Sequence, residues 1–141
     1  LPKGRGWSPH IWAIIQGQEE LTVSLLEASE KVDCGDIWHK STHQIPKYFL
    51  YNDIIEVVNQ AHVDLIDYAV EHHATVDPLP QDLHIAPTYL PKRTPVDSEI
   101  SVYESIASQF DLLRVCDNNR FPSFFHLHGK KFKITIESSD E

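Results

Sequence analysis

The sequence predicts an α/β fold, and three patterns carry that prediction. Apolar and polar residues alternate over 20–28 and again over 37–45, which is typical of strands. Residues 51–73 instead repeat apolar side chains at the period of an α-helix. The chain has 141 residues, a length that suits one domain or a piece of a larger one.

The first segment, LPKGRG at 1–6, is rich in Pro and Gly and predicts a loop. A helix should follow, with Ser8 as its cap and Pro9 in its first turn. Apolar residues then recur at helical spacing, and Gly17 marks the end of the helix. We expect Trp7 and Trp12 to pack against the protein rather than stack on a ligand.

The two predicted strands, 20–28 and 37–45, are separated by the polar, Gly-bearing loop SEKVDCGD. This arrangement favours antiparallel pairing. The long helix at 51–73 should bury one apolar face. The residues of that face are Ile54, Val57, Val58, Ala61, Leu65, Ile66 and Ala69.

The helical and alternating patterns stop at residue 74. Residues 74–98 hold five prolines and no clear period, so they predict a long ordered loop or connector. A helix is expected over roughly 99–115, capped by Asp97 or Ser98. Its inward residues would be Ile100, Val102, Ile106, Phe110 and Leu113. Residues 121–137 predict a β-hairpin with Gly129 and Lys130 near its turn.

Composition limits the classes of partner. With 12 basic and 21 acidic residues the net charge is −9, which disfavours general nucleic-acid binding because phosphate contacts need clustered Lys and Arg. Two short segments, 1–14 and 90–93, are locally basic, and this favours a small anionic ligand. No apolar run approaches the roughly 20 residues of a membrane span. Two cysteines far apart in the sequence favour a reducing, cytoplasmic location over a disulfide.

Four motifs, in order, carry a family resemblance. They are LPKGRG at 1–6, VDCGD at 32–36, KRTPVDSEI at 92–100 and LLRVCDNNRFPSFF at 112–125. Together they resemble the folate-dependent formyltransferases, which include methionyl-tRNA formyltransferase and the sugar-nucleotide N-formyltransferases. Each motif is weak alone, but the resemblance extends over nearly the whole chain. GWSPHIW at 6–12, TPVDSEI at 94–100 and the short hairpin at the end look closer to the sugar enzymes than to the tRNA enzyme.

The resemblance implies the fold and the domain organisation. Residues 1–80 would form the second part of a Rossmann-like formyltransferase domain. Residues 81–98 would be a connector, and 99–141 a C-terminal subdomain made of a helix and a short β-hairpin. In this family an Asn-x-His element lies just before the LPxxRG loop, so we expect an N-terminal part to precede residue 1. We therefore expect the chain alone to be inactive and marginally stable, or paired with another surface.

The resemblance also implies the chemistry. A primary amine would attack the formyl carbon of 10-formyltetrahydrofolate and lose a proton during transfer. Asp33 matches the catalytic Asp of the family and would orient a His and help to move that proton. The backbone at Val32, Cys34 and Gly35 would face the folate, and Gly35 would allow close approach to its flat ring. From the residues alone, the favoured interpretation of Asp33 is a turn former in a Gly-bearing loop, and the resemblance reverses that preference.

Three residues are candidates for binding the acceptor: Arg5, Tyr89 and Arg93. In the family the loop that holds Arg5 lies beside the active site. Tyr89, with the Lys-Arg pair that follows it, could stack on a base and bind a phosphate. The alternative for Arg93 is a salt bridge to Asp97 that fixes the connector.

Metal binding is not expected. His126 and His128 share one face of a predicted strand, but no third ligand stands at a suitable spacing. Cys34 lacks a neighbouring base that would make it a nucleophile, so we interpret it as a small side chain.

Three functions stay open at this point. The first is formyl transfer to the amine of an amino-sugar nucleotide, which the acidic net charge favours. The second is formylation of methionyl-tRNA, which would need a basic C-terminal domain. The third is a catalytically incomplete fragment or a binding module. A homo-oligomer is an open alternative for the assembly, and no membrane partner is expected.

Overall fold

The computed structural model of the chain describes residues 1–139, so the last two residues of the predicted 99–141 subdomain lie outside it. The strands are β1 Arg5–Gly6, β2 Glu20–Leu26, β3 Ile37–Gln44, β4 Tyr89–Leu90, β5 Phe124–Leu127 and β6 Lys130–Lys133. The α-helices are α1 Pro9–Ile15, α2 Tyr51–His72 and α3 Phe110–Arg114, and two short 3₁₀ helices are η1 Pro95–Ser98 and η2 Ala107–Gln109. None of the helices in residues 1–139 is long and apolar enough to cross a lipid bilayer.

The first helix forms where the sequence predicts it. Pro9 occupies its first turn, where the missing N–H of proline removes no hydrogen bond. Gly17 follows the helix with φ +81°, a left-handed conformation that glycine adopts without strain. Ser8 is the N-cap residue, as predicted, but it has φ 48° and its side chain makes no capping hydrogen bond.

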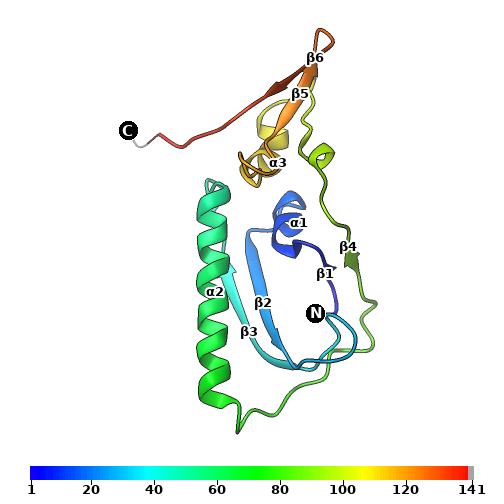
Figure 1. Ribbon diagram of the computed structural model, residues 1–141, viewed down its shortest axis with the longest axis vertical. Helices are drawn as coiled ribbons and strands as arrows, with labels where there is room; N and C mark the ends of the chain where they lie inside the picture. The colour runs from blue at the N-terminus through cyan, green and yellow to red at the C-terminus, as the bar shows by residue number, and fades with distance from the viewer. Residues whose placement is uncertain (140–141) are drawn as a thin grey trace.

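The two predicted strands pair as an antiparallel hairpin, with Leu21 opposite His43 and Val23 opposite Ser41. Helix α2 lies along this hairpin (Figure 1) and buries its apolar face against it. The main core joins α1, the hairpin and α2; it consists of Ile11, Ile14, Leu21, Ile45, Ile54, Val58 and Val115. Ile66 does not belong to the buried face as predicted. It is 59% exposed, since it lies beside the contacting stripe rather than within it.

The segment 74–98 is an ordered connector, as predicted. It runs from the end of α2 past the loop that closes the β2–β3 hairpin to β4 (Figure 1). There β4 pairs with β1 in parallel, so that Tyr89 stands opposite Arg5. The indole N–H of Trp12 donates to the carbonyl of Pro91 at 2.9 Å and fastens the connector to α1. Residues far apart in the sequence therefore meet at the β1–β4 pair.

The predicted helix over 99–115 is wrong in its first half. Glu99 pairs with Phe124 as an isolated parallel bridge, so this part of the backbone is extended. Gln109 then takes the backbone groups of Ser101: its side-chain oxygen accepts from the Ser101 N–H, and its amide donates to the Ser101 carbonyl at 3.0 Å. Within 99–115 only η2 and α3 are helical, and of the predicted inward residues Val102 and Ile106 are exposed. A side chain competes successfully with the helix for backbone hydrogen bonds here.

The C-terminal hairpin, β5 and β6, extends away from the rest of the chain (Figure 1). Its turn lies at His128 and Gly129, one residue earlier than expected. Both have positive φ, 51° and 72°. This is the backbone of the tight two-residue turns that match the twist of paired strands.

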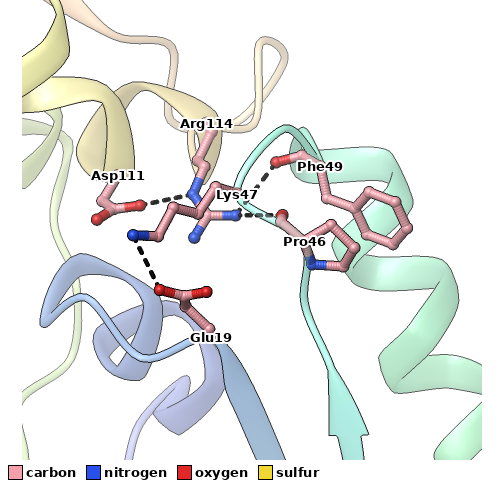
Figure 2. A network of polar contacts seen from close by, with 6 residues as sticks. All are labelled: Glu19, Pro46, Lys47, Phe49, Asp111 and Arg114. Atoms are coloured by element: carbon pink, nitrogen blue, oxygen red, sulfur yellow. Dashed lines mark hydrogen bonds and ion pairs between the residues drawn. The ribbon is translucent and has the colours of Figure 1, made fainter.

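A buried arginine joins this C-terminal part to the core. Arg114 is 1% exposed, and its guanidinium donates to Asp111 at 2.7 Å and to the carbonyl of Pro46 at 3.0 Å (Figure 2). The carbonyl of Phe49 lies at 3.5 Å from the same nitrogen, Nη1. Arg114 therefore fixes α3 against the turn that connects β3 to α2.

Candidate functional site

The loop between β2 and β3 holds Asp33 in a fixed position. Asp33 has φ 60°, a left-handed conformation that Asp tolerates better than most residues. Its Oδ2 accepts a hydrogen bond from the backbone N–H of Gly6 at 3.0 Å. The loop of the VDCGD motif is thereby fastened to the loop of the LPKGRG motif. One carboxylate oxygen is used in this way, and among residues 1–139 no hydrogen-bond donor contacts the other.

Gly35 is required by a close approach of two backbone segments. A Cβ at this position would lie 1.8 Å from the carbonyl oxygen of Glu27. The same loop is closed by a hydrogen bond of 2.8 Å from the Glu27 N–H to the carbonyl of Asp36. The close approach that only glycine allows is therefore to the protein's own strand end. The predicted contact of Gly35 with a folate ring stays a prediction.

Arg5 enters the same site from β1. Its backbone N–H donates to the carbonyl of Thr88 at 3.0 Å, and its Nη1 donates to the hydroxyl of Tyr89 at 3.1 Å. The hydrogen bond with Tyr89 is the main cause that raises the pKa of Arg5. The Nε atom of Arg5 is buried without a hydrogen-bond partner among the described residues. A buried donor without a partner is uncommon in folded proteins.

Gln81 connects the two loops, and the sequence reasoning missed it. Its amide nitrogen donates to the carbonyl of Asp33 at 2.9 Å and to the carbonyl of Gly35 at 2.8 Å. Its amide oxygen accepts from Nη2 of Arg5 at 2.7 Å. Gln81 is 7% exposed. A single Gln inside a Pro-rich connector carries no pattern that would have identified it.

Two of the predicted folate contacts differ in exposure. Val32 is 82% exposed, whereas Cys34 is half-buried and is a free thiol.

An exposed aromatic surface lies at the neighbouring strand pair. There Lys92 lies over the ring of Trp7, with 4.9 Å from Nζ to the ring centroid. The expected packing of Trp7 is wrong, since the residue is 59% exposed beside β1.

Arg93 is buried inside the connector. Its Nη2 donates to the backbone carbonyl of Asp97 at 2.9 Å and to the hydroxyl of Ser98 at 3.2 Å. The carboxylate of Asp97 instead accepts from the backbone N–H and the hydroxyl of Thr94. Arg93 and Asp97 are thus in contact as the structural alternative supposed, but through the carbonyl rather than a salt bridge. A role for Arg93 in binding an acceptor stays a prediction.

Of the two histidines of the C-terminal hairpin, His126 lies beside an acidic side chain. His126 Nδ1 lies 2.8 Å from a carboxylate oxygen of Glu99. No group of three or more His, Cys, Asp or Glu side chains suited to a metal ion occurs within residues 1–139.

The sequence is similar to curated methionyl-tRNA formyltransferases. It is 29% identical over 141 residues to the enzyme of Protochlamydia amoebophila, a match that covers 96% of this chain and 43% of that protein. It is 30% identical over 139 residues to the enzyme of Natranaerobius thermophilus, covering 95% and 43%. The chain thus spans less than half the length of these relatives. No protein-family model matches it.

Solved structures share the fold. The methionyl-tRNA formyltransferase of Clostridium thermocellum superposes with a TM-score of 0.80 at 22% identity, covering 99% of this chain and 60% of that chain. A sugar N-formyltransferase from Shewanella gives 0.77 at 18%, covering 99% and 58%. HypX of Aquifex aeolicus, solved with tetrahydrofolic acid, gives 0.74 at 20%, covering 96% and 24%. The predicted architecture is confirmed at this level.

Proposed function

We propose that this protein transfers a formyl group from 10-formyltetrahydrofolate to a primary amine, because the chain is similar in sequence to methionyl-tRNA formyltransferases and shares the fold of a solved one. The observation that carries the proposal is the junction of Asp33, Gly35 and Arg5 around Gln81. Three segments distant in sequence are held together there by directional hydrogen bonds. Such preorganisation is what a site needs when it acts on a developing charge.

The reaction assigns a specific task to Asp33. The amine nitrogen attacks the formyl carbon, and the bond between that carbon and the folate nitrogen breaks. The amine loses one proton, and the folate nitrogen gains one, so the products are the N-formyl acceptor and tetrahydrofolate. A carboxylate held by one oxygen, as Asp33 is held by the Gly6 N–H, can accept or relay this proton with the other.

The folate donor would lie against the loop of Asp33. The exposed Val32 side chain offers an apolar contact to a flat ring, and the half-buried Cys34 leaves room beside it. These residues are the part of the chain that would contact the donor. Gly35 would act indirectly, by keeping the loop tight against β2.

For the acceptor we propose an amino sugar linked to a nucleotide. The net charge of −9 opposes contact with a long polyanion, while cations are concentrated near the site. Arg5 keeps a buried Nε without a partner, and Lys92 lies over Trp7. Tyr89 is 64% exposed beside Arg5 and offers a stacking face. A small acceptor with a base and phosphates could use all four residues.

A second acceptor, methionyl-tRNA, is favoured by a different observation. The C-terminal hairpin carries Lys130, Lys131 and Lys133 within four residues of β6, together with the half-exposed Phe132. Exposed lysines with an aromatic residue among them are typical of surfaces that contact nucleic acid. The curated relatives described above are also tRNA enzymes.

The test uses the protein at its native length with 10-formyltetrahydrofolate. Amino-sugar nucleotides and methionyl initiator tRNA are offered in parallel, and mass spectrometry identifies the acceptor that gains one formyl group. Transfer to a sugar nucleotide supports the first acceptor, and transfer to the tRNA alone supports the second. Transfer to neither, with the folate donor intact, would overturn the proposed reaction.

A further inference from the structure

The side-chain amide of Gln81 makes all of its hydrogen bonds to the two loops of the proposed site. Both of its N–H groups are directed at backbone carbonyls of the VDCGD loop, Asp33 and Gly35, and its oxygen accepts from Arg5. The residue is almost fully buried. An amide in this setting is oriented in one way, because carbonyls accept and a guanidinium donates.

We propose that Gln81 is a positioning residue for the formyl-transfer site, which fixes the Asp33 loop and Arg5 relative to one another. The expected effect on kcat rests on the proposed function. The effect on the positions of the two loops does not. The Asp33 backbone has a left-handed φ of 60°, a conformation that needs support from its surroundings. Gln81 supplies that support on both sides of Cys34.

The hydrogen bonds of Gln81 complete a closed circuit of contacts. Gln81 binds Arg5, Arg5 precedes Gly6, and the Gly6 N–H binds the carboxylate of Asp33. The carbonyl of Asp33 accepts a hydrogen bond from the Gln81 amide, which closes the circuit. Loss of the Gln81 amide would therefore free the carbonyl of Asp33 and the Nη2 atom of Arg5, while the contact of Gly6 with Asp33 and that of Arg5 Nη1 with Tyr89 would remain.

The test compares three variants of the native-length protein: Gln81→Leu, Gln81→Glu and the control Gln60→Leu. Gln60 lies on the exposed side of α2, where its amide contacts Asp64. The Leu variant removes the hydrogen bonds at similar size. Gln81→Glu keeps the shape of the side chain. At pH 8 its carboxylate would place a hydrogen-bond acceptor opposite the carbonyls of Asp33 and Gly35, where the amide N–H groups were.

The first readout is amide hydrogen exchange, which needs no activity. We expect faster exchange in residues 4–7 and 29–36 for both Gln81 variants, and no change for Gln60→Leu. Unchanged exchange in both segments would overturn the proposal. So would full protection in Gln81→Glu, because shape rather than hydrogen bonding would then support the loop.

The second readout is kinetic. If Gln81 acts through Asp33, Gln81→Leu should lower kcat between about 10- and 100-fold, as small displacements of reacting groups do. The same change made on top of Asp33→Asn should lower kcat little further. An equal further loss would contradict positioning through Asp33. If the wild-type protein transfers no formyl group to any acceptor, the proposed function fails, and hydrogen exchange alone then decides the role of Gln81.

Discussion

The carboxylate of Asp33 accepts a hydrogen bond from the backbone N–H of Gly6, with 3.0 Å between Asp33 Oδ2 and Gly6 N. The two residues stand 27 positions apart and belong to two separate motifs, VDCGD and LPKGRG. Their contact aligns the edge of β1 with the loop that follows β2. The site is thus assembled from loops, and its geometry depends on the hydrogen bonds that join them.

Asp33→Asn should abolish most of the transfer activity without unfolding the protein. The amide oxygen can still accept from the Gly6 N–H, but it cannot take a proton from the amine. We expect kcat to fall by about 10² to 10⁴-fold, the usual range for loss of a general base. The melting temperature should change little. Asp67→Asn on the exposed side of α2 is the matched control, and near-normal kcat in Asp33→Asn would remove Asp33 from the mechanism.

Gly35→Ala should destabilise the protein severely. The new Cβ would meet the carbonyl oxygen of Glu27, a backbone atom that no side-chain rotation can move. We expect a loss of about 3 kcal/mol in the free energy of unfolding, at the upper end for overpacking. Gly4→Ala is the comparison, because its Cβ would meet nothing within 4 Å and only the left-handed φ of +75° opposes it. Urea unfolding measures both, and an equal loss in the two variants would contradict the prediction.

Arg114→Met should loosen the C-terminal part from the core. The substitution leaves the carbonyls of Pro46 and Phe49 without their buried donor. We expect a loss of about 2 kcal/mol, since the partner Asp111 is partly exposed and its ion pair is weakened by water. Lys47→Met is the control: its ion pair with Glu19 lies nearby in the same network (Figure 2) but is exposed. Equal stability of the two variants would show that Arg114 does not join the parts.

The carboxyl of Asp97 should titrate below its ordinary range. The backbone N–H of Thr94, and then its hydroxyl, lower the pKa of Asp97 by hydrogen bonding to the charged form. Because the folded pKa is depressed, the stabilisation is present above the unfolded pKa and is lost as the pH falls through the folded pKa. An NMR titration of the Asp97 side chain checks the direction. Thr94→Ala keeps the backbone donor, so it should raise this pKa only part of the way; a return to the ordinary value would contradict the order of the two causes.

The long helix and the central hairpin could be predicted from the sequence because their patterns are local. The period of Ile54, Val58 and Leu65 places them on one helical face whatever lies opposite. The prediction of a helix over 99–115 was wrong because contacts other than the apolar pattern decided the backbone there. Apolar spacing favoured a helix, but the side chain of Gln109 and the pairing of Glu99 with Phe124 took the backbone groups that a helix needs. Phe124 lies outside 99–115, and the spacing of apolar residues does not show that a polar side chain such as Gln109 will bind the backbone.

In the candidate site, too, some features follow from the sequence and others from the tertiary structure. The four motifs, the sign of the net charge and the candidates Arg5, Asp33, Gly35 and Tyr89 were determined by the sequence alone. That these residues meet, that Arg93 is buried in the connector, and that Gln81 joins the two loops was decided by the tertiary structure. The physical reason is that hydrogen bonds between loops are specified by distance and direction in space. Those quantities exist only after the connector has returned beside β1.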